Sequence, residues 1–161
     1  MSKRIGESLS DDLFHRLDGH DLERSADKVI LITTVDADGW PHPALLSYFE
    51  VIAKDRRNVR VASYGNSRTA GNMRENGKLT LAIVDTRAAY YVKGAVEELA
   101  SAMRSAPYNA KLNVRVTEVL ADEPNEALEP GAYVASGITY VNPQRRAELE
   151  KARLVLAELL E

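Results

Sequence analysis

The sequence contains no cysteine and only three histidines among its 161 residues. The lack of cysteine excludes disulfides, thiolate catalysis and iron–sulfur clusters. The histidines, His15, His20 and His42, show neither a His-Glu-x-x-His pattern nor another carboxylate–histidine spacing typical of bound metals. The sequence therefore predicts no metal site.

The sequence also lacks a net positive charge and long apolar runs. The formal net charge is −3 and the pI about 5.7, whereas nucleic-acid-binding domains usually carry a basic face and a high pI. No run of about 18 apolar residues could cross a bilayer, and the opening residues MSKRIGESLSDD lack the apolar segment of a signal peptide. We expect a cytoplasmic protein with neither a nucleic-acid nor a membrane partner.

Motifs of self-sufficient catalysis are missing too. The sequence has no G-x-S-x-G nucleophile turn, no three-glycine dinucleotide fingerprint and no P-loop lysine. No catalytic residue can be identified without such a motif. Any redox chemistry therefore depends on a bound cofactor.

The length and the hydrophobic periodicity predict one domain that is mainly β. Val29–Val35 and Leu45–Ile52 are apolar runs joined by an Asp-Ala-Asp-Gly turn, which is typical of a β-hairpin. Further strands are expected in the third run Asn58–Tyr64 and at residues 78–85, 88–101 and 110–122. Short helices are expected within residues 10–26, a short helix between strands 3 and 4, and an amphipathic helix at 143–160. About six mostly antiparallel strands, spanning residues 28–140, favour a small split or closed β-barrel over a sandwich.

A small polar cluster, Asn66, Ser67, Arg68 and Thr69, stands between the third strand and the short helix. A helix N-terminus presents free N–H groups and favours negative charge, and an arginine can grip a phosphate with two N–H groups. The alternative is that Asn66 or Ser67 caps the helix and that Arg68 is only solvated. Both interpretations remain open from the spacing.

Three successive segments, VDADGWPHPALL, VRVASYGNSRTAGNMRENGKLTLAIVD and AAYYVKGAVEEL, resemble the pyridoxamine 5′-phosphate oxidase-like family of FMN-binding split β-barrels. The resemblance covers about Val29 to Leu99. It implies a homodimer with FMN bound at the subunit interface. It also implies that Ser67 and Arg68 hold the flavin phosphate and that Ser63 lines the flavin. Thr69 stands where some members have a lysine, and His42 matches a strand end near the flavin.

One departure from the family pattern limits the functional prediction. Members that oxidise pyridoxamine phosphate carry an arginine and a lysine on the second strand, where this chain reads PHPALLSYF, and their C-terminal arginine–histidine motif has no counterpart here. The resemblance thus predicts an FMN-binding flavoprotein, a flavin-dependent oxidoreductase of unknown substrate, for which vitamin B6 oxidation is not expected. The alternative is a non-enzymatic dimeric module that binds flavin or another small anionic ligand.

Overall fold

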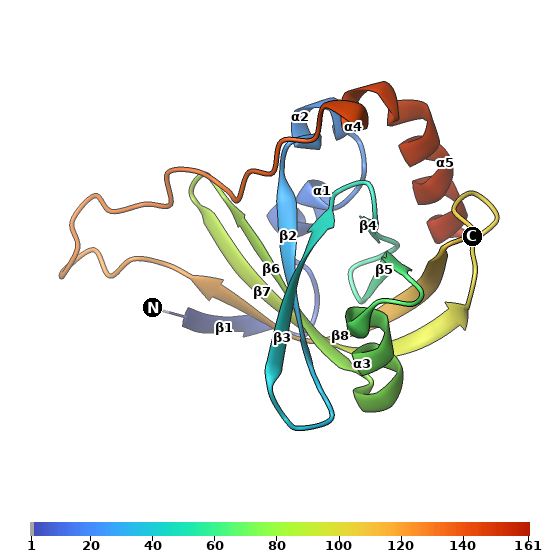
Figure 1. Ribbon diagram of the computed structural model, residues 1–161. Coiled ribbons are helices and arrows are strands. Elements are labelled where there is room, and N and C mark those ends of the chain that lie inside the picture. Colours follow the sequence, from blue (N-terminus) through green and yellow to red (C-terminus); the bar gives the residue numbers. More distant parts are fainter. Residues whose placement is uncertain (1) are drawn as a thin grey trace.

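The computed structural model describes residues 2–161 as a curled β-sheet with helices at its ends and over one face (Figure 1). The strands are β1 (Ser2–Gly6), β2 (Val29–Val35), β3 (Pro41–Ser47), β4 (Val51–Ala53), β5 (Asn58–Tyr64), β6 (Lys78–Asp85), β7 (Ala88–Ala100) and β8 (Asn109–Asp122). The helices are α1 (Asp11–Arg16), α2 (Leu22–Ser25), α3 (Arg68–Asn76), α4 (Pro143–Ala147) and α5 (Leu149–Leu160). None of the helices in this described part is long and apolar enough to span a membrane.

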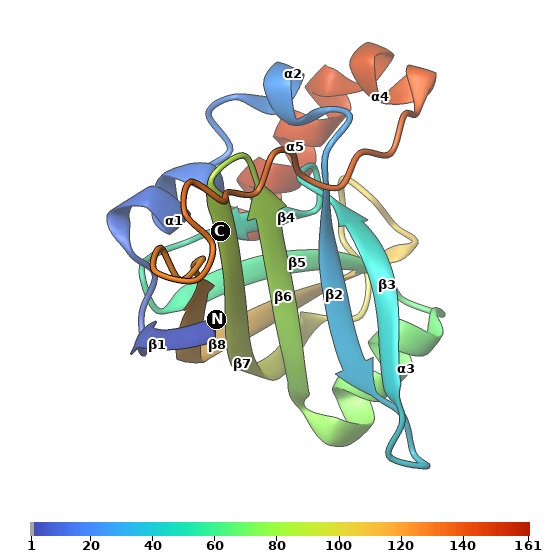
Figure 2. The same ribbon diagram turned by 90° about the vertical axis from the view of Figure 1, so that its left-hand side faces the viewer.

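The strands form one antiparallel sheet in the order β3-β2-β6-β7-β8-β5-β4, and β1 pairs with β8 beside this path. The two ends of the path, β3 and β4, are consecutive in the chain. The sheet therefore curls so that these two end strands approach each other (Figures 1 and 2). Within residues 2–161 no backbone hydrogen-bond ladder joins them. This is a split barrel, so the predicted fold class is confirmed.

The second run of the predicted hairpin divides into two strands. β3 ends at Ser47, and β4 turns away to pair with β5. The turn between them is held by side chains, because Ser47 Oγ accepts from the Phe49 N–H at 3.0 Å and Glu50 Oε2 accepts from the Ser47 N–H at 2.8 Å. This division and the polar strand β1 raise the strand number from about six to eight.

The hairpin itself follows local chemistry. Asp36 Oδ1 accepts from the N–H groups of Asp38 and Trp40, and Gly39 takes a positive φ of 85° that favours glycine. β2 and β3 pair in register from Val29 opposite Ser47 onwards. Pro41 and Pro43 are tolerated because β3 lies at the edge of the sheet.

Gly94 in β7 marks the predicted bulge. The register with β8 shifts between Lys93 and Gly94, and a Cβ built at Gly94 would lie 2.3 Å from Val114 Cγ1. Only glycine permits this approach of the two strands. The close contact bends the long β7 and helps the sheet to curl.

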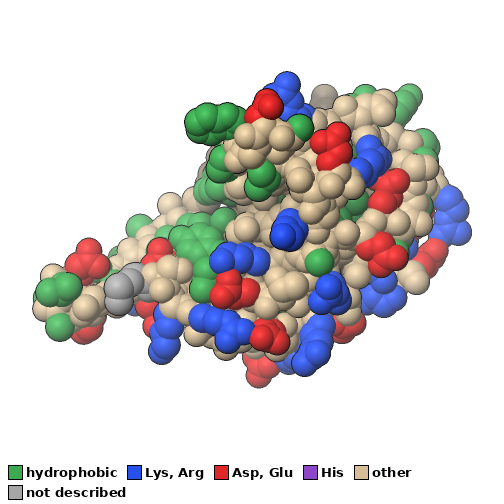
Figure 3. All heavy atoms as spheres, turned by 90° about the horizontal axis from the view of Figure 1, so that it is seen from below, with side chains coloured by type: hydrophobic (Ala, Val, Ile, Leu, Met, Phe, Trp, Pro, Cys, Tyr) green, Lys and Arg blue, Asp and Glu red, His purple; other side chains and the backbone are tan. Residues whose placement is uncertain are grey.

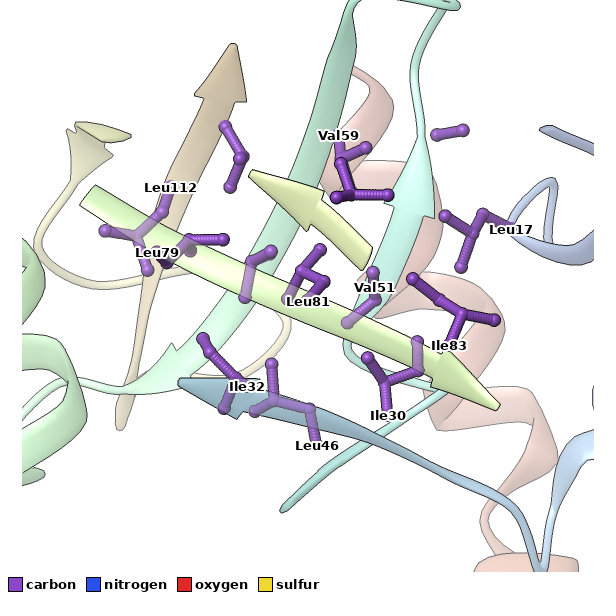
Figure 4. Packing of buried hydrophobic residues seen from close by; sticks show 14 of the residues in the cluster. Leu17, Ile30, Ile32, Leu46, Val51, Val59, Leu79, Leu81, Ile83 and Leu112 are labelled. Atoms are coloured by element: carbon purple, nitrogen blue, oxygen red, sulfur yellow. The ribbon is translucent and has the colours of Figure 1, made fainter. Parts of the chain in front are cut away.

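Two apolar clusters fill the fold. The larger cluster lies inside the barrel, and Figure 4 shows Ile30, Ile32, Leu79, Leu81 and Ile83 pointing into it. The smaller cluster lies outside the barrel, where Ala152, Val155, Leu156 and Leu159 of α5 pack on Ile52 of β4 and Ala62 of β5. The amphipathic helix predicted at 143–160 is thus present but divides at Glu148, and its longer part, α5, covers the outer face of β4 and β5.

Charged side chains of both signs are interspersed over the face seen from below (Figure 3). This mixing agrees with the small net charge. The face carries no continuous basic stripe of the kind that nucleic-acid-binding domains use.

Candidate functional site

The connection from β5 to α3 holds five of the six residues predicted from the sequence. Ser63 is buried at the end of β5, and α3 begins at Arg68. Ser67 is the N-cap, with extended backbone angles, and its Oγ accepts from the Ala70 N–H at 3.1 Å. The capping interpretation is therefore confirmed for Ser67, because its short hydroxyl satisfies one of the free donors of the first helical turn.

Three polar side chains at or near the connection from β5 to α3 have no partner within the described part of the chain. Arg68 is exposed and forms no hydrogen bond or ion pair with any residue in 2–161. The hydroxyls of Ser63 and Thr69 likewise make no hydrogen bond to the described residues, although both residues are buried. Asn66 is exposed beside them. A guanidinium and two hydroxyls in a segment that leads into a helix N-terminus suit the oxygens of a phosphate, so the residues present fit an FMN phosphate.

The loop between Tyr64 and Arg68 is held by residues that the sequence did not identify. Arg74, from the last turn of α3, donates through Nη1 to the Gly65 carbonyl at 2.7 Å and pairs through Nε with Glu98 at 2.6 Å. On the other side, the Gly65 N–H donates to the Tyr108 carbonyl at 2.8 Å. These contacts join segments that are distant in sequence, and no local motif indicates them.

A buried polar pair fixes α3 against the barrel. Asn72 Nδ2 donates to Thr34 Oγ1 at 3.0 Å, and both residues are buried. The sixth predicted residue, His42, lies opposite Thr34 in the β2–β3 ladder, so the two side chains share one face of the sheet. No hydrogen bond or ion pair joins the His42 side chain to the other five residues within 2–161.

The charge around the candidate site is modest. His42 is the one titratable side chain on β3. A phosphate at the start of α3 would therefore meet Arg68 and the helix dipole without cationic help from this strand. Among the described residues no group of three histidine or carboxylate side chains could hold a metal ion.

A different cavity lies between the α1–α2 connection and the β6–β7 end of the sheet, with a volume of about 340 Å³. Asp85 lies there, 2.7 Å from Lys28 Nζ and 3.3 Å from Arg16 Nη1. These contacts lower the pKa of Asp85 although its partial burial opposes them. Burial and the nearby Asp85 raise the pKa of the Tyr48 hydroxyl to about 12. None of the six predicted residues lines this cavity.

Comparisons with known proteins identify the family and the fold. The model of the pyridoxamine 5′-phosphate oxidase family matches residues 21–131. The uncharacterised YclD of Bacillus subtilis strain 168 is 40% identical over 85 residues, which are 53% of this chain and 55% of YclD. The chain thus spans about half the length of that relative.

Several solved structures share the fold at low sequence identity. A Lactobacillus delbrueckii protein named for pyridoxamine 5′-phosphate oxidase superposes with a TM-score of 0.58 and 17% identity, covering 73% of this chain and 98% of its own. HupZ of Group A Streptococcus superposes with a TM-score of 0.55 and 18% identity, covering 78% of this chain and 98% of HupZ. An FMN-binding protein of Syntrophomonas wolfei superposes with a TM-score of 0.53 and 14% identity, covering 67% of this chain and 86% of its own. The matched family model covers most of the chain, and the split barrel agrees with it: the protein belongs to the pyridoxamine 5′-phosphate oxidase family.

Proposed function

We propose that this protein binds FMN and acts as a flavin-dependent oxidoreductase, with the flavin phosphate held at the start of α3. The observation that carries the proposal is the set of partnerless groups there: the exposed Arg68 guanidinium and the hydroxyls of Ser63 and Thr69. Asn66 and Ser67 complete the loop around them. The similar fold of the FMN-binding protein from Syntrophomonas wolfei supports this choice of ligand.

Bound FMN would supply hydride or electron transfer. The part of this chain is to bind and orient the cofactor. Arg68 donates to the phosphate, the first turn of α3 offers its free N–H groups, and Arg74 keeps the loop in place through the Gly65 carbonyl. His42 lies on the sheet face of Thr34, where we propose that it lines the flavin.

We further propose that the protein works as a homodimer with the flavin at the subunit interface. The β2–β3 hairpin exposes Val35, Trp40 and Leu45, with Trp40 71% exposed, and Tyr64 and Tyr108 are exposed beside the candidate loop. Exposed apolar and aromatic side chains of this kind mark association surfaces. A second copy seated there would cover both the hairpin and the loop.

One observation favours a second function, a non-enzymatic module that binds flavin or another small anion. β3 carries no arginine or lysine, so the ligand would be held by fewer cations than the family pattern provides. Such a module would bind FMN without accepting electrons from a reductant such as NADPH.

The visible absorption spectrum of the purified protein, before and after FMN is added, tests the proposal. A yellow protein, or saturable FMN binding, is expected. Arg68→Ala should weaken FMN binding about ten- to hundredfold, since hydrogen bonds to charged groups contribute about 1.5–3 kcal/mol. Arg115→Ala, at an exposed arginine on β8, is the matched control.

Unchanged FMN affinity in Arg68→Ala would refute the phosphate site. Bleaching of the bound flavin by NADPH under anaerobic conditions supports the oxidoreductase, whereas a flavin that stays oxidised favours the binding module. Light scattering tests the dimer, and a monomer at micromolar concentration would contradict the interface site.

A further inference from the structure

A second polar cavity lies outside the barrel, next to the candidate flavin loop. It is an open pocket with a volume of about 440 Å³, bounded by the β3–β4 turn, the 105–109 segment and helices α4 and α5. Phe49, Pro107 and Val155 give it apolar walls. Tyr108 also lines it, and the Tyr108 carbonyl accepts from the Gly65 N–H of the candidate loop. The other lining residues are mostly polar or charged, so the space offers both apolar contact and hydrogen-bonding groups to a small molecule.

Glu50 is the distinctive polar residue of this cavity. Its Oε2 accepts from the Ser47 N–H at 2.8 Å, whereas its second carboxyl oxygen has no partner among residues 2–161. Burial raises the pKa of Glu50, and the hydrogen bond from Ser47 and the charge of Arg145 oppose that rise. A half-buried carboxylate with one oxygen that has no protein partner can accept a strong hydrogen bond from a charged donor.

The basic residues of the cavity do not neutralise Glu50 by contact. Arg145 donates to the Ala26 carbonyl at 3.2 Å and lies over the Tyr140 ring. Lys151 lies 3.9 Å from Glu148 at the exposed rim. The free oxygen of Glu50 therefore remains available to a ligand.

We propose that this cavity binds a small molecule that carries a protonated amine next to an apolar ring. The amine would donate to Glu50, and the ring would lie against Phe49 and Pro107. Helices α4 and α5 form one wall, and both lie beyond residues 21–131 that the family model matches. Glu50, Phe49 and Pro107 lie within the matched residues, so the C-terminal helices complete a site whose other walls belong to the family part of the chain. The inference does not require FMN at the β5–α3 connection.

Calorimetric titration of the full-length protein with tryptamine and with tryptophol tests the proposal. The two probes share the indole ring and differ in a terminal ammonium or hydroxyl group. We expect tryptamine to bind about tenfold more tightly than tryptophol, the difference that one charge-assisted hydrogen bond provides. Glu50→Gln should remove this preference, because the amide still accepts from the Ser47 N–H but carries no charge.

Glu148→Gln is the matched control, since Glu148 lines the same cavity but its side chain is 51% exposed. It should change tryptamine affinity less than about twofold, as expected for an exposed charge. Equal binding of both probes, or a preference for tryptamine that survives in Glu50→Gln, would overturn the proposal. Should Glu50→Gln fail to fold, the ratio of the two probes with the unmodified protein decides alone.

Discussion

The start of α3 and the end of α5 use polar groups in opposite ways. At the end of α5, Glu158 accepts from the Ser105 Oγ at 2.6 Å, from the Ser105 N–H at 2.7 Å and from the Arg104 N–H at 2.8 Å. At the start of α3, Arg68 has no partner in the described chain, and neither do the hydroxyls of Ser63 and Thr69. Glu158 joins two segments of the protein, whereas Arg68 joins none.

The difference separates a structural site from a binding site. A saturated carboxylate stabilises the fold and has little capacity left for a ligand, so its loss should be visible in stability. Groups without partners contribute little to stability, so their loss should be visible only when a ligand is added. Substitutions at the two sites should therefore affect ligand affinity and stability in opposite proportions.

The largest effect is expected for Ser67→Asp. Aspartate is as good an N-cap as serine and suits the helix dipole, so the melting temperature should stay the same or rise. Its negative charge should repel a phosphate and weaken FMN binding about hundredfold, which corresponds to about 2.7 kcal/mol. Calorimetry and thermal melting measure the two quantities. Ser67→Asn, a neutral cap, is the control, and equal FMN affinity in both variants would contradict a phosphate at this helix.

Asn72→Ala should mainly reduce stability. It leaves the buried Thr34 hydroxyl without its hydrogen bond and should lower the free energy of unfolding by about 1–3 kcal/mol. Chemical denaturation of Asn72→Ala, Thr34→Val and the double variant measures the coupling between the two side chains. If the two losses simply add, the hydrogen bond does not hold α3 against the barrel.

Glu158→Gln should reduce stability by about 1 kcal/mol near neutral pH and leave FMN affinity unchanged. The hydrogen bonds from Ser105 and Arg104 lower the pKa of Glu158 to about 2, from 4.5 in the unfolded chain. The stabilisation is therefore fully present above pH 4.5 and is lost as the pH falls towards 2. Thermal melting across this range, with Glu150→Gln on the exposed face of α5 as control, should show the variant and the parent converge in acid.

The smallest effect is expected for Arg74→Met. The methionine keeps an apolar side chain of similar length but loses the bonds to Gly65 and Glu98, which are partly exposed. Stability should change by less than about 1 kcal/mol, and FMN affinity should fall only about threefold. A fall as large as that of Arg68→Ala would mean that Arg74 contacts the ligand itself.

The sequence predicted the features that depend on neighbouring residues. The alternation of β-branched residues indicated β2 and β5, the Asp-x-Asp-Gly turn indicated the hairpin, and the serine before Arg68 indicated the start of α3. β1 was missed because Ser-Lys-Arg-Ile-Gly is polar and exposed, and it is a strand only because β8 lies beside it.

Features that depend on distant residues were not predictable in the same way. Nothing in the sequence around Arg74 shows that its side chain reaches Gly65, or that the carbonyl of Tyr108 anchors the same loop. The contact between Asn72 and Thr34 likewise exists only once α3 has packed against β2. The sequence therefore located the candidate phosphate site but not the residues that position it.

The prolines of β3 also limit whether a further strand can pair with the outer edge of the sheet. Backbone N–H groups of a strand alternate in direction, and the N–H of Ser47 points away from β2, towards Glu50. Residues 41, 43 and 45 share that direction, and two of them are prolines without an N–H. Among β3 residues, Leu45 is therefore the only one whose outward N–H group has no partner, since the Ser47 N–H is already bonded to Glu50. This edge is a poor template for another strand, so copies of the chain can associate through side chains without elongating into fibrils.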